Sequence, residues 1–346
     1  MTEPLANAVL DAPRGWTAAH MQTLRSRVRP PTAPTDAVAG TRLLRVPMDD
    51  GTGDELGLAL HSPVPAPAPA PAPQLVVLVH GLGGSAESAY ILATAAQLLR
   101  AGISVARLDL RGAGHSGTSS KQMYHAGRTA DVRAVLAALA AEPEADRRGD
   151  GASLALMGFS LGGNVTLKLL GEPLEGLPVV AGMSVSAPLD LAVGGEYLHH
   201  VAFGLYERAM LRGLKADVAR FAGPMTDDER EAVASARSLE EFDDAFTARQ
   251  NGWRDAAEYY ALNSSAQYLP HVTVPTLVLH SLDDPIVPSG PYRSIDWEWL
   301  AQHGPVRRAI TEHGGHVGFH QAGGRPPWYA EQAAAFFTGL ARSHRP

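Results

Sequence analysis

A serine in a glycine-flanked turn is the first feature of the sequence that could do chemistry. The run Gly158-Phe159-Ser160-Leu161-Gly162 has the form G-x-S-x-G; it follows an apolar stretch, Ser153–Met157, and precedes a helical pattern, Leu161–Leu170. In this context the pattern predicts a nucleophile elbow, a tight strand-to-helix turn that lifts the serine Oγ clear of a sheet. Glycine is expected at 158 and 162 because a side chain there would collide with neighbouring backbone. An ordinary glycine-rich helix start is the alternative interpretation.

A serine nucleophile needs a base, and the base needs a partner that orients it. Downstream of Ser160, the apolar run Thr276–Leu279 leads into a turn that carries Asp283 and Asp284. Farther on, His316 follows another strand-like run. In this arrangement the histidine takes the serine proton, and an aspartate fixes the histidine tautomer and stabilises the imidazolium.

A glycine-rich loop after the apolar run Leu75–Val79 is the candidate for binding an oxyanion. The loop reads His80-Gly81-Leu82-Gly83-Gly84. We expect the backbone N–H groups of Leu82 and Leu161 to form the oxyanion hole. His80 lies upstream of the serine, so we expect it to hold the loop by a hydrogen bond and not to act as the base.

Three histidines near the C-terminus, His313, His316 and His320, raise the alternative of a metal site. The spacing H-x-x-H-x-x-x-H is not a strong zinc signature, and Gly314 and Gly315 would break a helix that aligned the three rings. The chain has no cysteine, which excludes thiolate ligands, thiolate nucleophiles and disulfides. We therefore expect neither a metal nor a cofactor.

The elements that must position these residues alternate between buried strands and amphipathic helices from residue 75 onward. This alternation predicts βαβ units and a mostly parallel sheet of about eight strands, with right-handed crossovers. Residues 188–270 interrupt it with charged, helical stretches. We interpret residues 1–40 as an N-terminal extension, 41–187 and 271–346 as an α/β-hydrolase core, and 188–270 as a helical cap inserted between two strands.

Composition narrows the classes of function. With 346 residues, of which 45% are hydrophobic, the chain can bury a large core. The formal net charge of −7 argues against nucleic acid as a partner, because binding it needs a basic surface. The N-terminus lacks a signal-peptide pattern, and Leu75–Val79 is much shorter than the ~20 residues of a membrane-spanning helix. We expect a cytoplasmic protein with no integral membrane segment and a small-molecule ester as substrate; the oligomeric state stays open.

The motifs together resemble the YheT-like branch of the α/β-hydrolases, which is related to abhydrolase-domain phospholipases and to yeast medium-chain ester synthase/esterases. The resemblance spans most of the chain and rests on the elbow and on the following runs: His20-Met21-Gln22-Thr23, His80 to Ser85, Tyr124-His125-Ala126-Gly127, Ser186 to Leu191, Asp283-Asp284-Pro285 and His313 to Phe319. It implies a triad of Ser160, Asp284 and His316 that acts on short- or medium-chain acyl esters without a cofactor.

The choice of Asp284 over Asp283 rests on that resemblance and on a proline. In this fold the triad acid typically lies in a D-x-x-x-P arrangement, and Asp284 has this spacing to Pro288. Asp283 is then expected to cap or brace the turn.

Two other functions use the same residues. An acyltransferase would pass the acyl group to an alcohol instead of water, with an identical elbow and triad. A non-catalytic binding protein could keep the fold, although the presence of Ser160, Asp284 and His316 argues against it. We also expect Tyr124–Gly127 to form an anchored loop, and Tyr259, Tyr260 and Trp253 to pack between cap and core.

Overall fold

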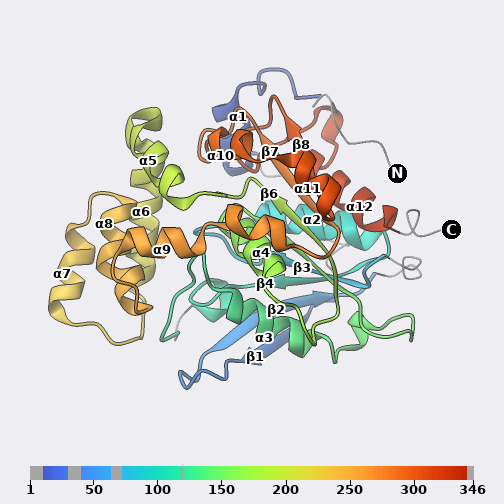
Figure 1. Ribbon diagram of the computed structural model, residues 1–346, viewed down its shortest axis with the longest axis horizontal. Helices are drawn as coiled ribbons and strands as arrows, with labels where there is room; N and C mark the ends of the chain where they lie inside the picture. The colour runs from blue at the N-terminus through green and yellow to red at the C-terminus, as the bar shows by residue number, and fades with distance from the viewer. Residues whose placement is uncertain (1–10, 30–39, 64–71, 118–119, 341–346) are drawn as a thin grey trace.

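The computed structural model describes residues 11–29, 40–63, 72–117 and 120–340. Its centre is an eight-stranded sheet with the strand order β1-β2-β4-β3-β5-β6-β7-β8 (Figure 1). The pairs β1–β2 and β2–β4 are antiparallel and all the others are parallel. The strands are β1 (Arg42–Pro47), β2 (Glu55–His61), β3 (Leu75–Val79), β4 (Ser104–Leu108), β5 (Leu154–Phe159), β6 (Val179–Val185), β7 (Thr276–Ser281) and β8 (Val306–Thr311). The predicted α/β-hydrolase fold is confirmed.

Strands β3 and β5, at the centre of the sheet, are apolar throughout because both faces of the sheet are covered. In β3, Leu75, Val77 and Val79 belong to one hydrophobic cluster, and Val76 and Leu78 belong to another. Successive side chains of a strand point to opposite faces, so the two clusters are the cores on either side of the sheet. Helices α3 and α4 contribute to the first cluster, and α2 and α12 to the second.

The helices outside the segment between β6 and β7 are α1 (Ala19–Val28), α2 (Ala89–Arg100), α3 (Thr129–Leu139), α4 (Leu161–Gly171), α10 (Gly290–Ser294), α11 (Trp297–His303) and α12 (Trp328–Gly339). The longest helix in the described ranges is α6, with 14 residues, and none of the described helices is long and apolar enough to cross a membrane.

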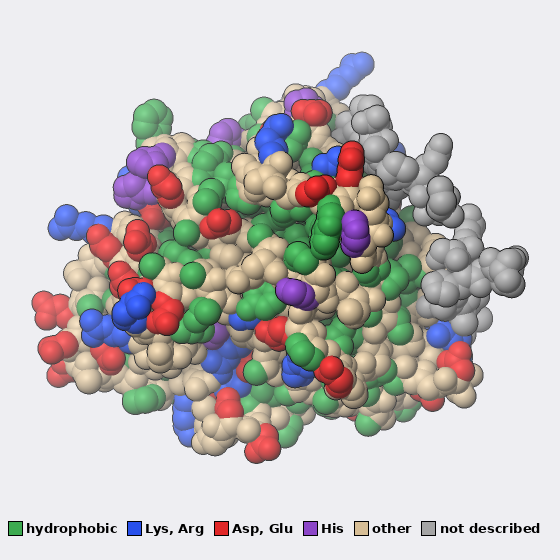
Figure 2. Space-filling view, viewed as in Figure 1, with side chains coloured by type: hydrophobic (Ala, Val, Ile, Leu, Met, Phe, Trp, Pro, Cys, Tyr) green, Lys and Arg blue, Asp and Glu red, His purple; other side chains and the backbone are tan. Residues whose placement is uncertain are grey.

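Between β6 and β7 the chain forms helices only. They are α5 (Leu191–His200), a 3-10 turn (Val201–Gly204), α6 (Leu205–Val218), α7 (Asp227–Ser235), α8 (Leu239–Phe242), a π-helical turn (Asp243–Ala248), α9 (Ala256–Asn263) and a second 3-10 segment (Ser265–His271). Helices α5 to α8 gather at one end of the sheet, on the left of Figure 1. Helices α6 to α8 share a small apolar core that includes Leu211, Val233 and Phe242. Acidic and basic side chains cover the outer surface of this part of the molecule (Figure 2).

The N-terminal region departs from expectation. The interpretation of residues 1–40 as an N-terminal extension assigns no helix to them, but Ala19–Val28 form helix α1. The helix packs against the loop that carries His316, and its Thr23 hydroxyl accepts a hydrogen bond from the backbone N–H of His316. The contact joins residues far apart in the sequence, so the weak local pattern of residues 19–28 did not indicate a helix here. Residues 1–10 and most of the proline-rich run 63–73 lie outside the described residues.

Candidate active site

Ser160 occupies a strained turn between β5 and α4. Its backbone angles, φ 51° and ψ −122°, lie in a region that residues other than glycine seldom adopt. The turn is tight: a Cβ on Gly158 would lie 2.1 Å from the carbonyl oxygen of Gly162, and a Cβ on Gly162 would lie 2.4 Å from that of His80. The expectation that both positions require glycine is confirmed. The strain and the two close approaches present the Ser160 side chain at the end of the sheet.

The structure brings Ser160, His316 and Asp284 together in one hydrogen-bonded chain. The Ser160 hydroxyl lies 3.0 Å from His316 Nε2, and His316 Nδ1 lies 2.9 Å from Asp284 Oδ2. If Nδ1–H donates to the carboxylate, Nε2 is left to accept the serine proton, which is the tautomer that a general base needs. The three residues come from separate loops, each directly after a strand of the parallel sheet.

Asp284 is held as an anion by its surroundings. The residue is 3% exposed, and its Oδ1 accepts hydrogen bonds from the backbone N–H groups of Ile286 and Val287 at 2.8 and 2.9 Å. Burial acts to raise the pKa of this carboxyl, but His316 and the backbone donors outweigh burial and leave the pKa below its ordinary value. The carboxylate therefore remains charged beside the imidazole.

Asp283 faces the same loop but holds its backbone. Its Oδ1 accepts from the N–H groups of Gly314 and Gly315 at 3.0 and 2.9 Å, and its Oδ2 lies 3.1 Å from His313 Nδ1. The expected bracing role is confirmed, although Asp283 braces the loop that carries His316 as well as its own turn, where it also accepts from the Ser281 hydroxyl.

The proposed oxyanion donors, Leu82 and Leu161, both line the pocket beside Ser160. Within the described residues neither backbone N–H has a protein acceptor. Leu161 is the first residue of α4, where N–H groups have no partner inside the helix. Two free N–H groups beside the serine are the arrangement that an oxyanion requires.

Side-chain hydrogen bonds fix the loop that carries Leu82. The hydroxyls of Tyr90 and Tyr124 accept from the N–H groups of Gly81 and Gly83 at 2.9 and 2.8 Å. His80 Nε2 accepts from the N–H of Leu110, and its Nδ1 lies 2.8 Å from the Gly81 carbonyl oxygen. Burial lowers the pKa of His80, which keeps the ring neutral. The expectation that His80 holds the loop is confirmed; the role of Tyr90 is visible only in the structure.

Helix α1 is the part of the site that the sequence did not reveal. Thr23 Oγ1 accepts from the backbone N–H of His316 at 2.9 Å and donates to the Ala19 carbonyl. The Gln22 side chain is buried; its Oε1 accepts from the N–H of His320 at 2.7 Å, and its Nε2 donates to the Trp16 carbonyl. The run His20–Thr23 therefore clamps the loop that carries the candidate base.

Replacing Thr23 with valine should lower turnover. Valine keeps the shape but leaves the His316 N–H without its acceptor, which costs about 1–3 kcal/mol in a part-buried site. Misplacement of the imidazole by a fraction of an ångström should reduce kcat by about 10- to 100-fold. Steady-state kinetics and a thermal melt measure both effects. Thr23→Ser retains the hydroxyl and should behave like the unchanged protein; equal losses in both variants would contradict this role.

A buried histidine lies behind the candidate acid. His280, fully buried at the end of β7, stacks on Tyr292 with ring centroids 3.7 Å apart, and its Nδ1 lies 3.9 Å from Asp284 Oδ2. Burial lowers the pKa of His280 to about 4, so the ring is neutral at physiological pH. His280 and Tyr292 thus form a packed wall behind the carboxylate and add no charge to it.

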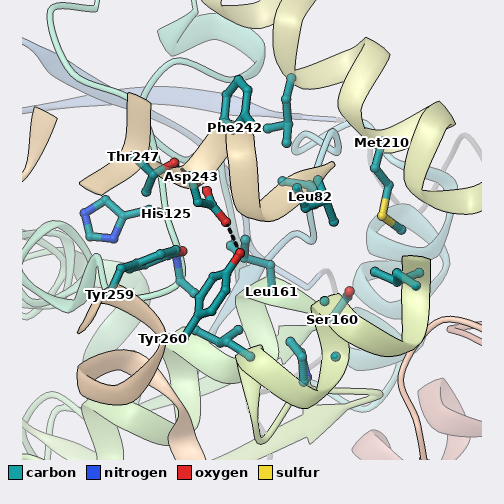
Figure 3. A pocket seen from close by; sticks show the side chains of 18 of the residues that line it. Leu82, His125, Ser160, Leu161, Met210, Phe242, Asp243, Thr247, Tyr259 and Tyr260 are labelled. Atoms are coloured by element: carbon teal, nitrogen blue, oxygen red, sulfur yellow. Dashed lines mark hydrogen bonds between the residues drawn. The ribbon is translucent and has the colours of Figure 1, made fainter. Parts of the chain in front are cut away.

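A large pocket opens beside Ser160 and extends under the helices between β6 and β7. It encloses about 910 Å3 of empty space, part of it open to solvent. Most of its lining is apolar, with Leu161 and Leu82 from the core and Met210 and Phe242 from the helical segment (Figure 3).

The aromatic residues noted in the sequence lie along this pocket. Tyr259 and Tyr260 line it, and Trp253 stacks on Tyr259 with centroids 4.9 Å apart.

The loop 124–127 is held by hydrogen bonds. The Tyr259 hydroxyl accepts from the N–H of Ala126 at 2.9 Å, and His125 Nδ1 accepts from the N–H of Gly127. The expectation that residues 124–127 form an anchored loop is confirmed.

One carboxylate lies in the pocket, on the π-helical turn. Burial raises the pKa of Asp243 from 3.8 to about 6, so the folded protein binds this proton more tightly than the unfolded chain does. The stability contributed by protonation is present at low pH and is lost as pH rises from about 4 through 6.

Replacing Asp243 with asparagine should remove this pH dependence, because asparagine does not titrate. The unchanged protein loses stability as pH rises through 6, so the melting temperature of Asp243→Asn minus that of the unchanged protein should increase from pH 5 to pH 8. Asp244→Asn serves as the control for charge; a pH-independent difference for Asp243→Asn would contradict the shift.

The C-terminal histidines do not gather around a common point. His316 contacts Ser160 and Asp284, and His313 contacts Asp283. Across the described ranges, no group of three or more His, Cys, Asp or Glu residues is arranged to hold a metal ion.

Comparisons with known proteins identify the family to which the fold belongs. The family described as alpha/beta hydrolase fold matches residues 74–322. The putative esterase YheT of Escherichia coli is 33% identical over 253 residues, 70% of each chain. The monoacylglycerol lipase of Saccharomyces cerevisiae is 26% identical over 275 residues, which cover 76% of this chain and 58% of that protein. A solved esterase of Pyrococcus furiosus has a TM-score of 0.58 at 17% identity, covering 90% of this chain and 95% of that one.

These matches extend over the regions that carry the site. The family match begins just before β3 and ends just after the loop with His316, so it includes the elbow and both downstream loops. The relative from E. coli bears out the resemblance that the motifs carried. With the fold, the sheet order and the matched length in agreement, this chain belongs to the α/β-hydrolase superfamily.

Proposed function

We propose that the protein hydrolyses carboxylic esters of short to medium acyl chain length, with Ser160 as nucleophile, His316 as general base and Asp284 as the residue that orients the base. The observation that carries the proposal is the hydrogen-bonded chain from Ser160 Oγ through His316 to Asp284, at 3.0 and 2.9 Å. The relatives named esterase and lipase support ester hydrolysis in general.

The reaction runs in two steps. Ser160 Oγ attacks the ester carbonyl while His316 Nε2 takes its proton, and the negative oxygen of the tetrahedral intermediate accepts from the N–H groups of Leu82 and Leu161. His316 then protonates the departing alcohol, leaving an acyl-serine. Water attacks this ester with His316 again as base, which releases the acid and restores Ser160. No metal or cofactor takes part.

We further propose that residues 188–270 act as a cap that sets the acyl length. Met210, Leu214, Leu239 and Phe242 come from this segment and face the same pocket as Ser160. A mostly apolar pocket suits an alkyl chain, since each buried methylene contributes about 0.8 kcal/mol.

Shortening a cap side chain should therefore move the length preference. Met210→Ala removes three heavy atoms from the pocket lining, so the optimum should shift toward acyl chains longer by ~2–3 methylene groups. The measurement is kcat/KM for p-nitrophenyl esters from C2 to C16. Leu205→Ala is the matched control, because Leu205 lies in the same helix, is 60% exposed and does not line the pocket. An unchanged profile in Met210→Ala would remove the cap from the proposal.

A direct test of the function combines that ester series with a fluorophosphonate probe. The protein should turn over short and medium esters and should acquire one probe adduct, located at Ser160 by peptide mass spectrometry. Failure to react with both the probe and every ester would refute the proposed function. Adding ethanol and analysing the products separates hydrolysis from transfer of the acyl group to an alcohol.

A further inference from the structure

The pocket has a second polar group besides the candidate nucleophile. Asp243 lies across the pocket from Ser160 in Figure 3, and the side chains of Leu82 and Leu161 lie between them in this view. Of the described residues that line the pocket, none is Lys or Arg. Asp243 also makes no ion pair with any residue in the described ranges. A carboxylate is thus placed in a mostly apolar cavity with no protein cation to compensate it.

The hydrogen bonds of Asp243 leave it able to accept more. Oδ1 accepts from Thr247 Oγ1 at 2.6 Å, and Oδ2 accepts from the Tyr260 hydroxyl at 2.7 Å. A carboxylate oxygen has two lone pairs, so each oxygen keeps one acceptor position. The π-helical turn places Asp243 and Thr247 together, and such turns are frequent at functional sites. The cluster is therefore ordered by the protein and still has unused acceptor capacity.

The presence of the Asp243 carboxylate in the lining argues against a ligand that is only hydrocarbon. An apolar chain that reached Asp243 would strip the carboxylate of water and offer nothing in return, which is costly for a charged group. A ligand that brings its own donor removes this cost. A hydroxyl fits better than an ammonium group, because most of the rest of the lining is apolar and a cation loses far more hydration on entering it.

We propose that Asp243, held by Tyr260 and Thr247, forms a subsite that accepts a hydrogen bond from a hydroxyl at the far end of the ester's buried chain. The natural substrate is then an ester whose chain bears a distal hydroxyl, and Asp243 selects it over the plain alkyl ester. This inference rests on the proposed function, because it assigns the second end of a substrate whose carbonyl lies at Ser160.

The test compares p-nitrophenyl ω-hydroxyalkanoates from C6 to C12 with unsubstituted alkanoates of the same length. The ratio of kcat/KM, hydroxylated over plain, should pass through a maximum of about 10- to 100-fold at the one or two lengths that reach Asp243, chiefly through KM. The alcohol part of the ester, and not the acyl part, could occupy the pocket. A second series tests this orientation by comparing alkanediol monoacetates with alkyl acetates of the same length. Ratios near one at every length in both series would overturn the proposal. A larger gain with ω-ammonium esters would identify a cation site and overturn the hydroxyl assignment.

Variants separate recognition from a structural role. Asp243→Ala should abolish the preference, and Asp243→Asn, which keeps one acceptor oxygen, should restore part of it. Tyr260→Phe removes one of the two hydrogen bonds that order Asp243, so it should lower the preference, but less than Asp243→Ala does. The neighbouring control Asp244→Asn should retain the preference. Each ratio is taken within one variant, so a general loss of activity cancels. An unchanged preference in Asp243→Ala would overturn the subsite. Equal loss of preference in Asp243→Ala and in the control Asp244→Asn would mean that the effect comes from the fold of the segment and not from recognition, and would also overturn it. Absence of turnover of any ester by the unchanged protein would instead refute the proposed function.

Discussion

Replacing Ser160 with alanine is expected to abolish nearly all ester turnover while the protein folds normally. The substitution removes only Oγ, the atom that lies 3.0 Å from His316 Nε2. The free N–H groups of Leu82 and Leu161 and the pocket remain, so a residual acceleration of about 10³–10⁴ over the uncatalysed reaction should persist. The measurement is kcat/KM for p-nitrophenyl butyrate, together with the loss of fluorophosphonate labelling.

The matched control is a serine on the neighbouring strand. Ser184 lies in β6, is fully buried, and its Oγ has no hydrogen-bond partner in the described part of the chain. Ser184→Ala should therefore retain activity and melt close to the unchanged protein. Comparable turnover in Ser160→Ala and the unchanged protein would exclude Ser160 as the nucleophile.

The second large effect separates two adjacent carboxylates. Asp284→Asn should keep the fold but reduce kcat by up to about 10⁴-fold, because the amide can stabilise the wrong tautomer of His316 and cannot stabilise its imidazolium form. Asp284 is the only one of the pair bonded to His316, at 2.9 Å from Nδ1. The rate of a single-turnover acylation and the melting temperature should be measured together.

Asp283→Asn is the natural comparison for that result. Its Oδ1 holds the N–H groups of Gly314 and Gly315, and an amide oxygen can still accept from them. We expect a far smaller change in kcat and a loss of stability of ~1 kcal/mol. If Asp283→Asn were the inactive variant, the acid would be one residue away from our assignment; if both variants were active, the turn after β7 would not supply it.

Features that depend on local geometry could be predicted from the sequence. The continuous apolar runs of β3 and β5 indicate strands covered on both faces, since a strand with one wet face alternates. The glycines at 158 and 162 mark a turn in which a Cβ would meet backbone at 2.1 and 2.4 Å. The order of Ser160, Asp284 and His316, each after a strand of a parallel sheet, predicts their convergence because the carboxyl ends of such strands share one edge.

What only the tertiary structure decided are the contacts between segments distant in the sequence. Thr23 meets the N–H of His316 across 293 positions, and Gly83 meets the hydroxyl of Tyr124 across 41. No periodicity encodes such a pair, because each partner is an ordinary polar residue whose role arises from what is packed against it. The same holds for Asp243, which reads as one acid in a charged helical stretch. Asp243 lines the pocket and accepts a hydrogen bond from Tyr260 because α9 packs against the π-helical turn. This packing, which the sequence pattern does not indicate, makes Asp243 a candidate determinant of specificity.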